Sequence, residues 1–206
     1  MVAAIKTAAA HLPPAGLHAL IKQRTGDLHR RLDSAPALLA LMRPGLDLPL
    51  YTRILQRFAA AYACIEPLLY ALESNRPAQM SVYRPRLPAL QADLARLPDT
   101  APMPELPPLS LPPTADAAAH YLGMRYVLEG STQGARLISA RLEQNLPQLR
   151  EQAFNYWLLQ REAAAEWPTF SRCLDQAAIG AEPLSRGAKI AFSTFLDAFL
   201  SPDPSA

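Results

Sequence analysis

The side chain in this sequence best suited to hold a metal is histidine, and His29 is the histidine with a partner at helical spacing. Asp33 follows four residues later, so on a helix the two side chains lie on the same face. A carboxylate bonded to the far nitrogen of a ligating imidazole fixes the tautomer and the orientation of the ring. Lys22, seven residues before His29, adds a cation on a similar face. This stripe can bind a metal macrocycle through its iron and an acidic edge; the alternative is an ordinary surface pair of His29 with Asp33.

A second candidate is a pair of glycines inside a strongly helical stretch, Gly130 and Gly134, followed directly by Ser131 and Ala135. Each glycine costs a helix interior about 1 kcal/mol relative to alanine. At a spacing of four residues the pair removes the side chains from one helix face, exposes backbone carbonyls and favours a kink. Two interpretations stay open: a flat ligand lies against this backbone, or two helices pack closely through small residues.

The more familiar catalytic signatures are absent from the sequence. It has no His-Glu-x-x-His or Glu-x-x-His pair for zinc or di-iron sites. It also has no glycine-rich phosphate loop and no Gly-x-Ser-x-Gly elbow. Hydrolase and nucleotide-binding functions are therefore disfavoured.

Charge and cysteine content exclude further classes. Twenty Lys and Arg against eighteen Asp and Glu give a net charge of +2, a field too weak for general nucleic-acid binding. The two cysteines, Cys64 and Cys173, stand far apart and form neither a disulfide framework nor a zinc motif, so we expect a cytoplasmic protein. No apolar run reaches the roughly 18–20 residues that cross a bilayer, so we expect no membrane partner.

The elements that must position these residues are helices, because apolar residues recur at three and four positions and strict alternation is rare. We predict one compact all-α domain of six to eight helices over residues 14–200, after an N-terminal arm at 1–13 and before a tail at 201–206. The predicted helices span residues 14–34, 37–42, 50–72, 84–97, 114–146 with Thr114 as cap, 149–176 with a break near Trp167-Pro168, and 183–200.

Seven prolines between residues 98 and 113 predict an extended surface connector within the domain. Proline lacks the N–H that a helix needs and clashes with the preceding turn. The aromatic residues at helical spacing are expected to lie mostly in the core, although Tyr62 can point its hydroxyl into a pocket.

Four stretches of the chain resemble the heme oxygenase family, and they cover nearly all of it, from about residue 17 to 200. Residues 22–33 resemble the family's first helix, which holds the proximal histidine, and residues 50–67 resemble its second long helix. Residues 126–135 (YVLEGSTQGA) resemble the distal helix, especially of bacterial members found beside bacteriophytochromes, and residues 188–192 (AKIAF) resemble the closing helix. The resemblance implies a heme oxygenase-like all-α fold and a monooxygenase that degrades heme to biliverdin, CO and iron.

The same resemblance implies roles for individual residues. His29 would be the axial ligand of the heme iron, with Asp33 as its supporting partner, and Lys22 would meet a heme propionate. Gly130 and Gly134 would lie over the distal face, where a kinked helix keeps bulk away from the iron and helps to orient O2.

Further positions follow from the family pattern or depart from it. Tyr62 would sit near the distal hydrogen-bond network, and Phe192 would help to wall the pocket. Ser131 stands where mammalian-type members carry an aspartate, so proton delivery would rely on water, Ser131 or backbone carbonyls. Ala135 replaces the second glycine of the usual pair and would tighten the distal pocket, and Gln133 is more polar than the leucine of many bacterial members.

The implied partners are heme, O2 and an external electron donor of the ferredoxin or reductase type, since no flavin or nicotinamide motif is present. The likeness of the distal stretch to bacteriophytochrome-associated members suggests a bacteriophytochrome as the acceptor of biliverdin. Two alternatives stay open: a non-catalytic heme-binding or heme-trafficking protein on the same fold, and a helical interaction module that binds no cofactor.

Overall fold

The computed structural model describes residues 16–98, 103–111 and 116–200. Within those ranges the chain forms ten α-helices, eight of them eight residues or longer, with three short 3-10 helices and no strand. The predicted all-α single domain is confirmed, and none of the described helices has the length and apolar character needed to cross a bilayer. The predicted arm, the predicted tail, Thr114, and connector residues 99–102 and 112–113 lie outside the described residues.

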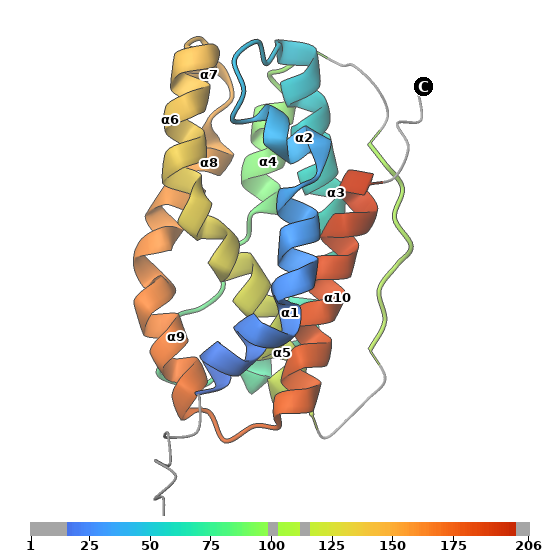
Figure 1. Cartoon of the computed structure of the whole chain (residues 1–206), viewed down its shortest axis with the longest axis vertical. Coiled ribbons are helices and arrows are strands. Elements are labelled where there is room, and N and C mark those ends of the chain that lie inside the picture. The colour runs from blue at the N-terminus through green and yellow to red at the C-terminus, as the bar shows by residue number, and fades with distance from the viewer. Residues whose placement is uncertain (1–15, 99–102, 112–115, 201–206) are drawn as a thin grey trace, which may run out of the picture.

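The helices are named in chain order and are shown in Figure 1. The α-helices are α1 (Leu17–Asp33), α2 (Pro36–Ala40), α3 (Leu48–Leu72), α4 (Leu87–Leu94), α5 (Ala117–Gly130), α6 (Ala135–Asn145), α7 (Leu149–Gln152), α8 (Asn155–Ala163), α9 (Trp167–Gln176) and α10 (Ala181–Leu200). The 3-10 helices are η1 (Glu73–Asn75), η2 (Ser131–Gly134) and η3 (Ala164–Glu166).

Helices α3, α5 and α10 form the centre of the bundle, with α10 packed along α5 and also against α1 and α3. Every residue of α5 from Ala119 to Glu129 is buried. The apolar faces of α3 and α10, including Ile54, Leu55 and Phe195, belong to the same core. Burial of apolar surface contributes about 25 cal/mol per Å², so this core fixes the position of α5, the helix that leads into the predicted glycine segment.

The contact between α5 and α10 is so close that it requires two glycines. A Cβ built on Gly123 would overlap the carbonyl oxygen of Leu184 and lie 2.8 Å from the amide nitrogen of Ala188. A Cβ on Gly187 would overlap the carbonyl oxygen of His120 and lie 2.8 Å from its Cα. Both obstacles are backbone atoms of the facing helix, which cannot rotate away, so neither position accepts a side chain without moving the two helices apart.

The predicted helix over residues 114–146 is interrupted, and this part of the prediction is wrong. Helix α5 ends at Gly130, η2 forms the next turn, and α6 begins at Ala135. The hydroxyls of Ser131 and Thr132 donate to the carbonyl oxygens three residues back, of Leu128 at 2.7 Å and Glu129 at 2.6 Å. Such bonds compete with the α-helical ladder. The interruption therefore falls at the predicted glycine segment.

The predicted helix over residues 149–176 is divided more often than expected. The break near Trp167 is present, with η3 before it and Pro168 in the first turn of α9. A further break separates α7 from α8. There the carboxylate of Asp93, in α4, accepts the backbone N–H groups of Asn155 and Tyr156, each at 2.9 Å, and so caps α8.

The described part of the proline-rich connector, residues 103–111, has no regular secondary structure and runs along the side of the bundle (Figure 1). Its three leucines, Leu106, Leu109 and Leu111, pack against the core. The thiol of Cys64, in α3, lies 3.9 Å from the carbonyl oxygen of Pro107. Within those residues the segment is the extended surface connector that its prolines predict.

Candidate active site

Helix α1 carries most of the predicted ligand side chains and is lightly anchored. Among its seventeen residues only Ile21 and Thr25 are buried, and the helix packs on α10 and α9. Its first turn is capped from α9, because the Asp175 carboxylate accepts the backbone N–H of His18 at 2.8 Å. Lys22 and His29 lie on exposed parts of this helix.

The structure brings His29 and Asp33 together as their spacing predicts. His29 Nδ1 lies 2.8 Å from Asp33 Oδ2, and the two side chains are 62% and 65% exposed. Because Nδ1 faces the carboxylate, Nε2 is the nitrogen left for another partner. The ring of His29 also meets the ring of Phe192, in α10, edge to face at 5.9 Å. The imidazole is thus held from two sides and remains accessible from outside.

Helices α1 and α5 meet one turn before the predicted site residues. The side chains of Thr25 and Tyr126 are in hydrogen-bond contact there. One turn further along each helix stand His29 on α1 and Gly130 on α5. Beyond this point α1 continues beside α10, whereas η2 and α6 pack on α8 (Figure 1). His29 and the glycine segment therefore each follow the Thr25–Tyr126 contact by one turn, and they lie on segments that diverge from it.

The packing around Gly130 and Gly134 separates the two interpretations of the pair. A Cβ on Gly134 would meet only Cδ1 of Ile138, at 3.8 Å, among the described residues, and a Cβ on Gly130 would meet the ring of Trp167 at 3.4 Å. Within 4 Å of either built Cβ the described structure has no backbone atom of a second helix. Their φ angles of −62° and −81° are also ordinary for any residue. Backbone strain therefore explains neither glycine. Gly130 leaves room for the Trp167 ring of α9, whereas the surroundings of Gly134 in the described structure show no close packing.

A buried polar cluster lies behind this segment. The hydroxyls of Tyr62 and Tyr156 are 3.4 Å apart, and the side chain of Ser131 is in hydrogen-bond contact with Tyr62. Gln160 Nε2 donates to the hydroxyl of Tyr156 at 3.1 Å and to that of Ser131 at 3.4 Å. Burial raises the pKa of Tyr62 and of Tyr156, so both hydroxyls stay protonated near neutral pH.

Charged side chains support this cluster from the interior. Arg86 Nε donates to Gln160 Oε1 at 3.2 Å, and its NH2 group donates to Glu129 Oε2 at 2.9 Å. Arg125 donates to the other carboxylate oxygen of Glu129 at 2.6 Å. All three charged side chains are almost fully buried. A buried ion pair of this kind is costly to break, because the remaining partner would be an uncompensated charge.

The remaining predicted site residues lie in different surroundings. Phe192 is 4% exposed and forms part of the wall behind His29. Ala135 is 1% exposed and packs in the core, so its methyl group does not lie on the exposed side of the segment. Gln133 is exposed and donates through Nε2 to the hydroxyl of Thr132 at 3.1 Å.

Comparison with known proteins decides the family, although no family model matches the chain. The chain is 33% identical over 160 residues to a heme oxygenase of Xanthomonas campestris pv. campestris (strain 8004). The matched region covers 76% of this chain and 92% of that relative. The chain belongs to the heme oxygenase family. This identity extends over most of the two chains, and the all-α fold agrees with it.

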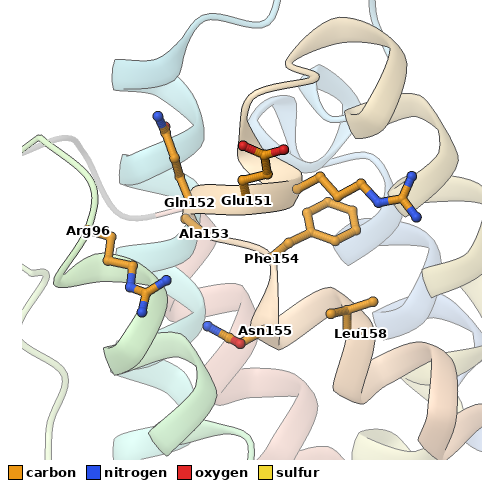
Figure 2. A pocket seen from close by; sticks show the side chains of 8 residues that line it. Arg96, Glu151, Gln152, Ala153, Phe154, Asn155 and Leu158 are labelled. Carbon is orange, nitrogen blue, oxygen red and sulfur yellow. The ribbon is translucent and has the colours of Figure 1, made fainter.

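A cavity of this heme oxygenase lies away from His29 and the glycine segment. It measures about 40 Å³ and lies where α7 meets α8, with Arg96, Glu151 and Asn155 among its lining residues (Figure 2). Its volume is far below the roughly 300 Å³ at which ligand pockets begin. This cavity therefore has no room for a porphyrin.

Five residues of the cluster and its charged support were not anticipated from the sequence: Arg86, Arg125, Glu129, Tyr156 and Gln160. Arg86 and Gln160 are 74 residues apart, and Arg86 and Glu129 are 43 apart, so no helical spacing relates them. One signal was available, since Glu129 is a charge directly after the apolar residues Tyr126, Val127 and Leu128.

Proposed function

We propose that this member of the heme oxygenase family cleaves heme to biliverdin, CO and iron, with O2 and electrons from an external donor. Membership of the family carries the proposal. It is supported by an imidazole that keeps Nε2 accessible and by a glycine segment in which a Cβ on Gly134 would meet only Cδ1 of Ile138 among the described residues. A non-catalytic heme-binding protein would need the first feature and would have no use for the second.

In this proposal His29 Nε2 holds the heme iron while the Asp33 carboxylate fixes the tautomer from the other side of the ring. Phe192 limits the rotation of the imidazole by edge-to-face contact, and Lys22 meets a propionate. Heme itself supplies the redox chemistry with O2 when it is bound. The protein's part is to orient the macrocycle and to exclude side chains from its distal face, which Gly130 and Gly134 do by lacking a Cβ.

Ser131 and Tyr62 are the polar groups that we assign to the distal side. The hydroxyl of Ser131 donates to the carbonyl oxygen of Leu128, and Ser131 accepts from Gln160. Its proton is therefore committed to the backbone, and we infer that water, rather than Ser131 alone, delivers protons to the reaction. Tyr62 keeps its proton because burial raises its pKa.

The other partners follow from the chemistry. The reaction consumes electrons, and the sequence has no flavin or nicotinamide motif, so we propose a ferredoxin or a reductase as donor. Both cysteines, Cys64 and Cys173, are free thiols in the structure, which fits a reducing compartment, and we place the reaction in the cytoplasm. We also propose a bacteriophytochrome as the acceptor of biliverdin, since the glycine segment with Ser131 resembles that branch.

The test is a hemin titration followed by one aerobic turnover with ascorbate or a ferredoxin system. We expect a Soret band at one hemin per chain and then the absorbance of biliverdin, whose isomer chromatography identifies. A stable Soret band without biliverdin would favour the non-catalytic heme-binding protein, and no Soret band at all would favour the helical interaction module.

The ligand assignment has its own test. His29→Ala is expected to lose the wild-type ferric spectrum and turnover, because the side chain proposed to hold iron is gone. His18→Ala is the matched control on the same helix, since His18 packs on Tyr126 and Trp167. A wild-type spectrum in His29→Ala would remove the axial role from His29.

A further inference from the structure

The ring of Trp167 lies against the glycine segment at one of its two glycines. A Cβ built on Gly130 would lie 3.4 Å from Cη2 and 3.6 Å from Cζ3 of this ring. A Cβ built on Gly134 would meet only Cδ1 of Ile138, at 3.8 Å, among the described residues. The side-chain-free face of the segment is thus covered at its first glycine and open at its second, and the edge of one aromatic ring marks where the open part begins.

Three aromatic neighbours hold the ring of Trp167 in this place. Its centroid lies 5.7 Å from that of Phe170, with the two planes stacked at 16°, and 5.7 Å from that of Tyr126. The ring of His18, in α1, meets it edge to face at 5.5 Å. A ring enclosed on several sides cannot change its rotamer without losing these contacts, so Trp167 is a fixed boundary of the open face rather than a mobile cover.

Polar contacts fix the start of α9 relative to the glycine segment. Gln133, in η2, donates through Nε2 to the carbonyl oxygen of Ala164 at 3.4 Å, and this bond ties η2 to η3, three residues before Trp167. The carboxylate of Glu166, the residue before Trp167, accepts a hydrogen bond from the hydroxyl of Ser81. The distance of the ring from the two glycines is therefore set by bonds on both sides of η3 as well as by packing.

The two tryptophans of the chain differ in what their indole N–H groups do. Nε1 of Trp157, in the core, donates to the hydroxyl of Tyr51 at 3.1 Å. Nε1 of Trp167 donates to no described residue, so a hydrogen bond to the described protein does not explain why an indole stands there. Trp167 is half-buried, and the remaining part of its apolar ring is exposed beside the open glycine face. Such an apolar surface next to helix backbone suits contact with a flat apolar ligand.

We propose that Trp167 is a specificity-determining residue, whose ring confines the heme to the Gly134 side of the segment and thereby restricts which meso carbon is cleaved. This inference rests on the proposed function. Once His29 holds the iron, a flat macrocycle can still turn about the bond between iron and imidazole. A fixed ring at one end of the open face admits some of these seatings and collides with the substituents of the macrocycle in others. One apolar group more or less in a pocket discriminates by about tenfold or more.

The experiment compares the wild type with Trp167→Leu, which removes the ring, and with Trp167→Phe, which keeps a smaller one. Proton NMR of the ferric hemin complex reports the seatings without any turnover, because each seating gives its own set of shifted heme methyl signals. We expect the ratio of the seating populations to change about tenfold in Trp167→Leu and by less in Trp167→Phe. One turnover with ascorbate should then change the ratio of the biliverdin isomers in the same direction.

Cys173→Ala is the matched control, since it removes a buried side chain from the same helix, six residues beyond Trp167. If Trp167 served only the packing of α9, its variants would lose stability in urea without any change in the seatings or the isomers. Wild-type populations in Trp167→Leu, or an equal change in Cys173→Ala, overturn the inference. If Trp167→Leu does not fold, wild-type populations in Trp167→Phe overturn it. A wild-type protein without a Soret band would overturn the proposed function as well, whereas a normal wild-type band with unchanged seatings in the variants overturns this inference alone.

Discussion

Two glycine pairs in this molecule have opposite surroundings. Gly123 and Gly187 let the backbones of α5 and α10 touch, and a Cβ at either would overlap a carbonyl oxygen of the facing helix. Gly130 and Gly134 have no such neighbour, and a Cβ at Gly134 would meet only one methyl carbon, at 3.8 Å, in the described structure. The first pair is required by the fold, and the second pair is not.

The two pairs differ in what offsets the loss of helix stability that each glycine causes. A helix-interior glycine costs about 1 kcal/mol, and at the α5–α10 contact the close packing of two buried helices offsets it. Gly130 leaves room for the Trp167 ring of α9, 3.4 Å from its built Cβ, whereas Gly134 has no such contact among the described residues. The binding of heme that we propose at this segment would account for the glycine at position 134.

The largest loss of stability is expected when a side chain is added at the α5–α10 contact. Gly123→Ala should lower the free energy of unfolding by about 3 kcal/mol or more, or prevent folding, because the added methyl meets backbone that cannot move aside. Urea unfolding followed by circular dichroism measures this. Gly26→Ala in the exposed helix α1 is the control, and its Cβ meets only the flexible end of Arg30 at 3.4 Å. A Gly123→Ala protein as stable as the Gly26→Ala protein would refute the requirement.

Substitution in the second pair should change hemin affinity much more than stability. Gly134→Leu is expected to change the free energy of unfolding by less than about 1 kcal/mol, since the new side chain enters open space. Hemin affinity should fall tenfold or more, because the leucine covers the face that we assign to the substrate. Hemin titration with parallel urea unfolding separates the two effects. Ala140→Leu, at an exposed position of α6, should leave both unchanged. Unaltered hemin binding in Gly134→Leu would place the substrate elsewhere.

The sequence predicted those parts of the fold and of the site that depend on neighbours along the chain. The helices follow from apolar spacing, and the contact of His29 with Asp33 follows from one helical turn. The glycine segment was found because glycine is unfavourable inside any helix, and a kink was predicted there, although the structure ends α5 at this point. For these features tertiary packing agrees with the local preference.

Features that join distant segments were not predictable in this way. Asp93 caps α8 from a position about sixty residues earlier in the chain, and nothing near residue 154 indicates a helix break. Gln160 makes its hydrogen bonds only because Arg86, at the start of α4, and Ser131, in η2, are brought to it in α8. The difference in surroundings between the glycine pairs has the same origin, since only the facing helix reveals which pair is in backbone contact.

Acid should weaken the α5–α10 contact by a smaller amount than Gly123→Ala. His120, whose backbone meets Gly187, is buried there, and burial together with the nearby Arg186 lowers the pKa of its imidazole below the ordinary 6.5. Below about pH 6.5 the unfolded chain therefore takes up a proton that the folded chain refuses, so stability falls until the pH reaches the lowered folded pKa. The loss is limited to about 1.4 kcal/mol for each unit of lowering. Urea unfolding of the wild type and of His120→Gln between pH 7.5 and 5.5 isolates this contribution. We expect a steeper decline in the wild type, and equal slopes would assign the acid sensitivity to other groups.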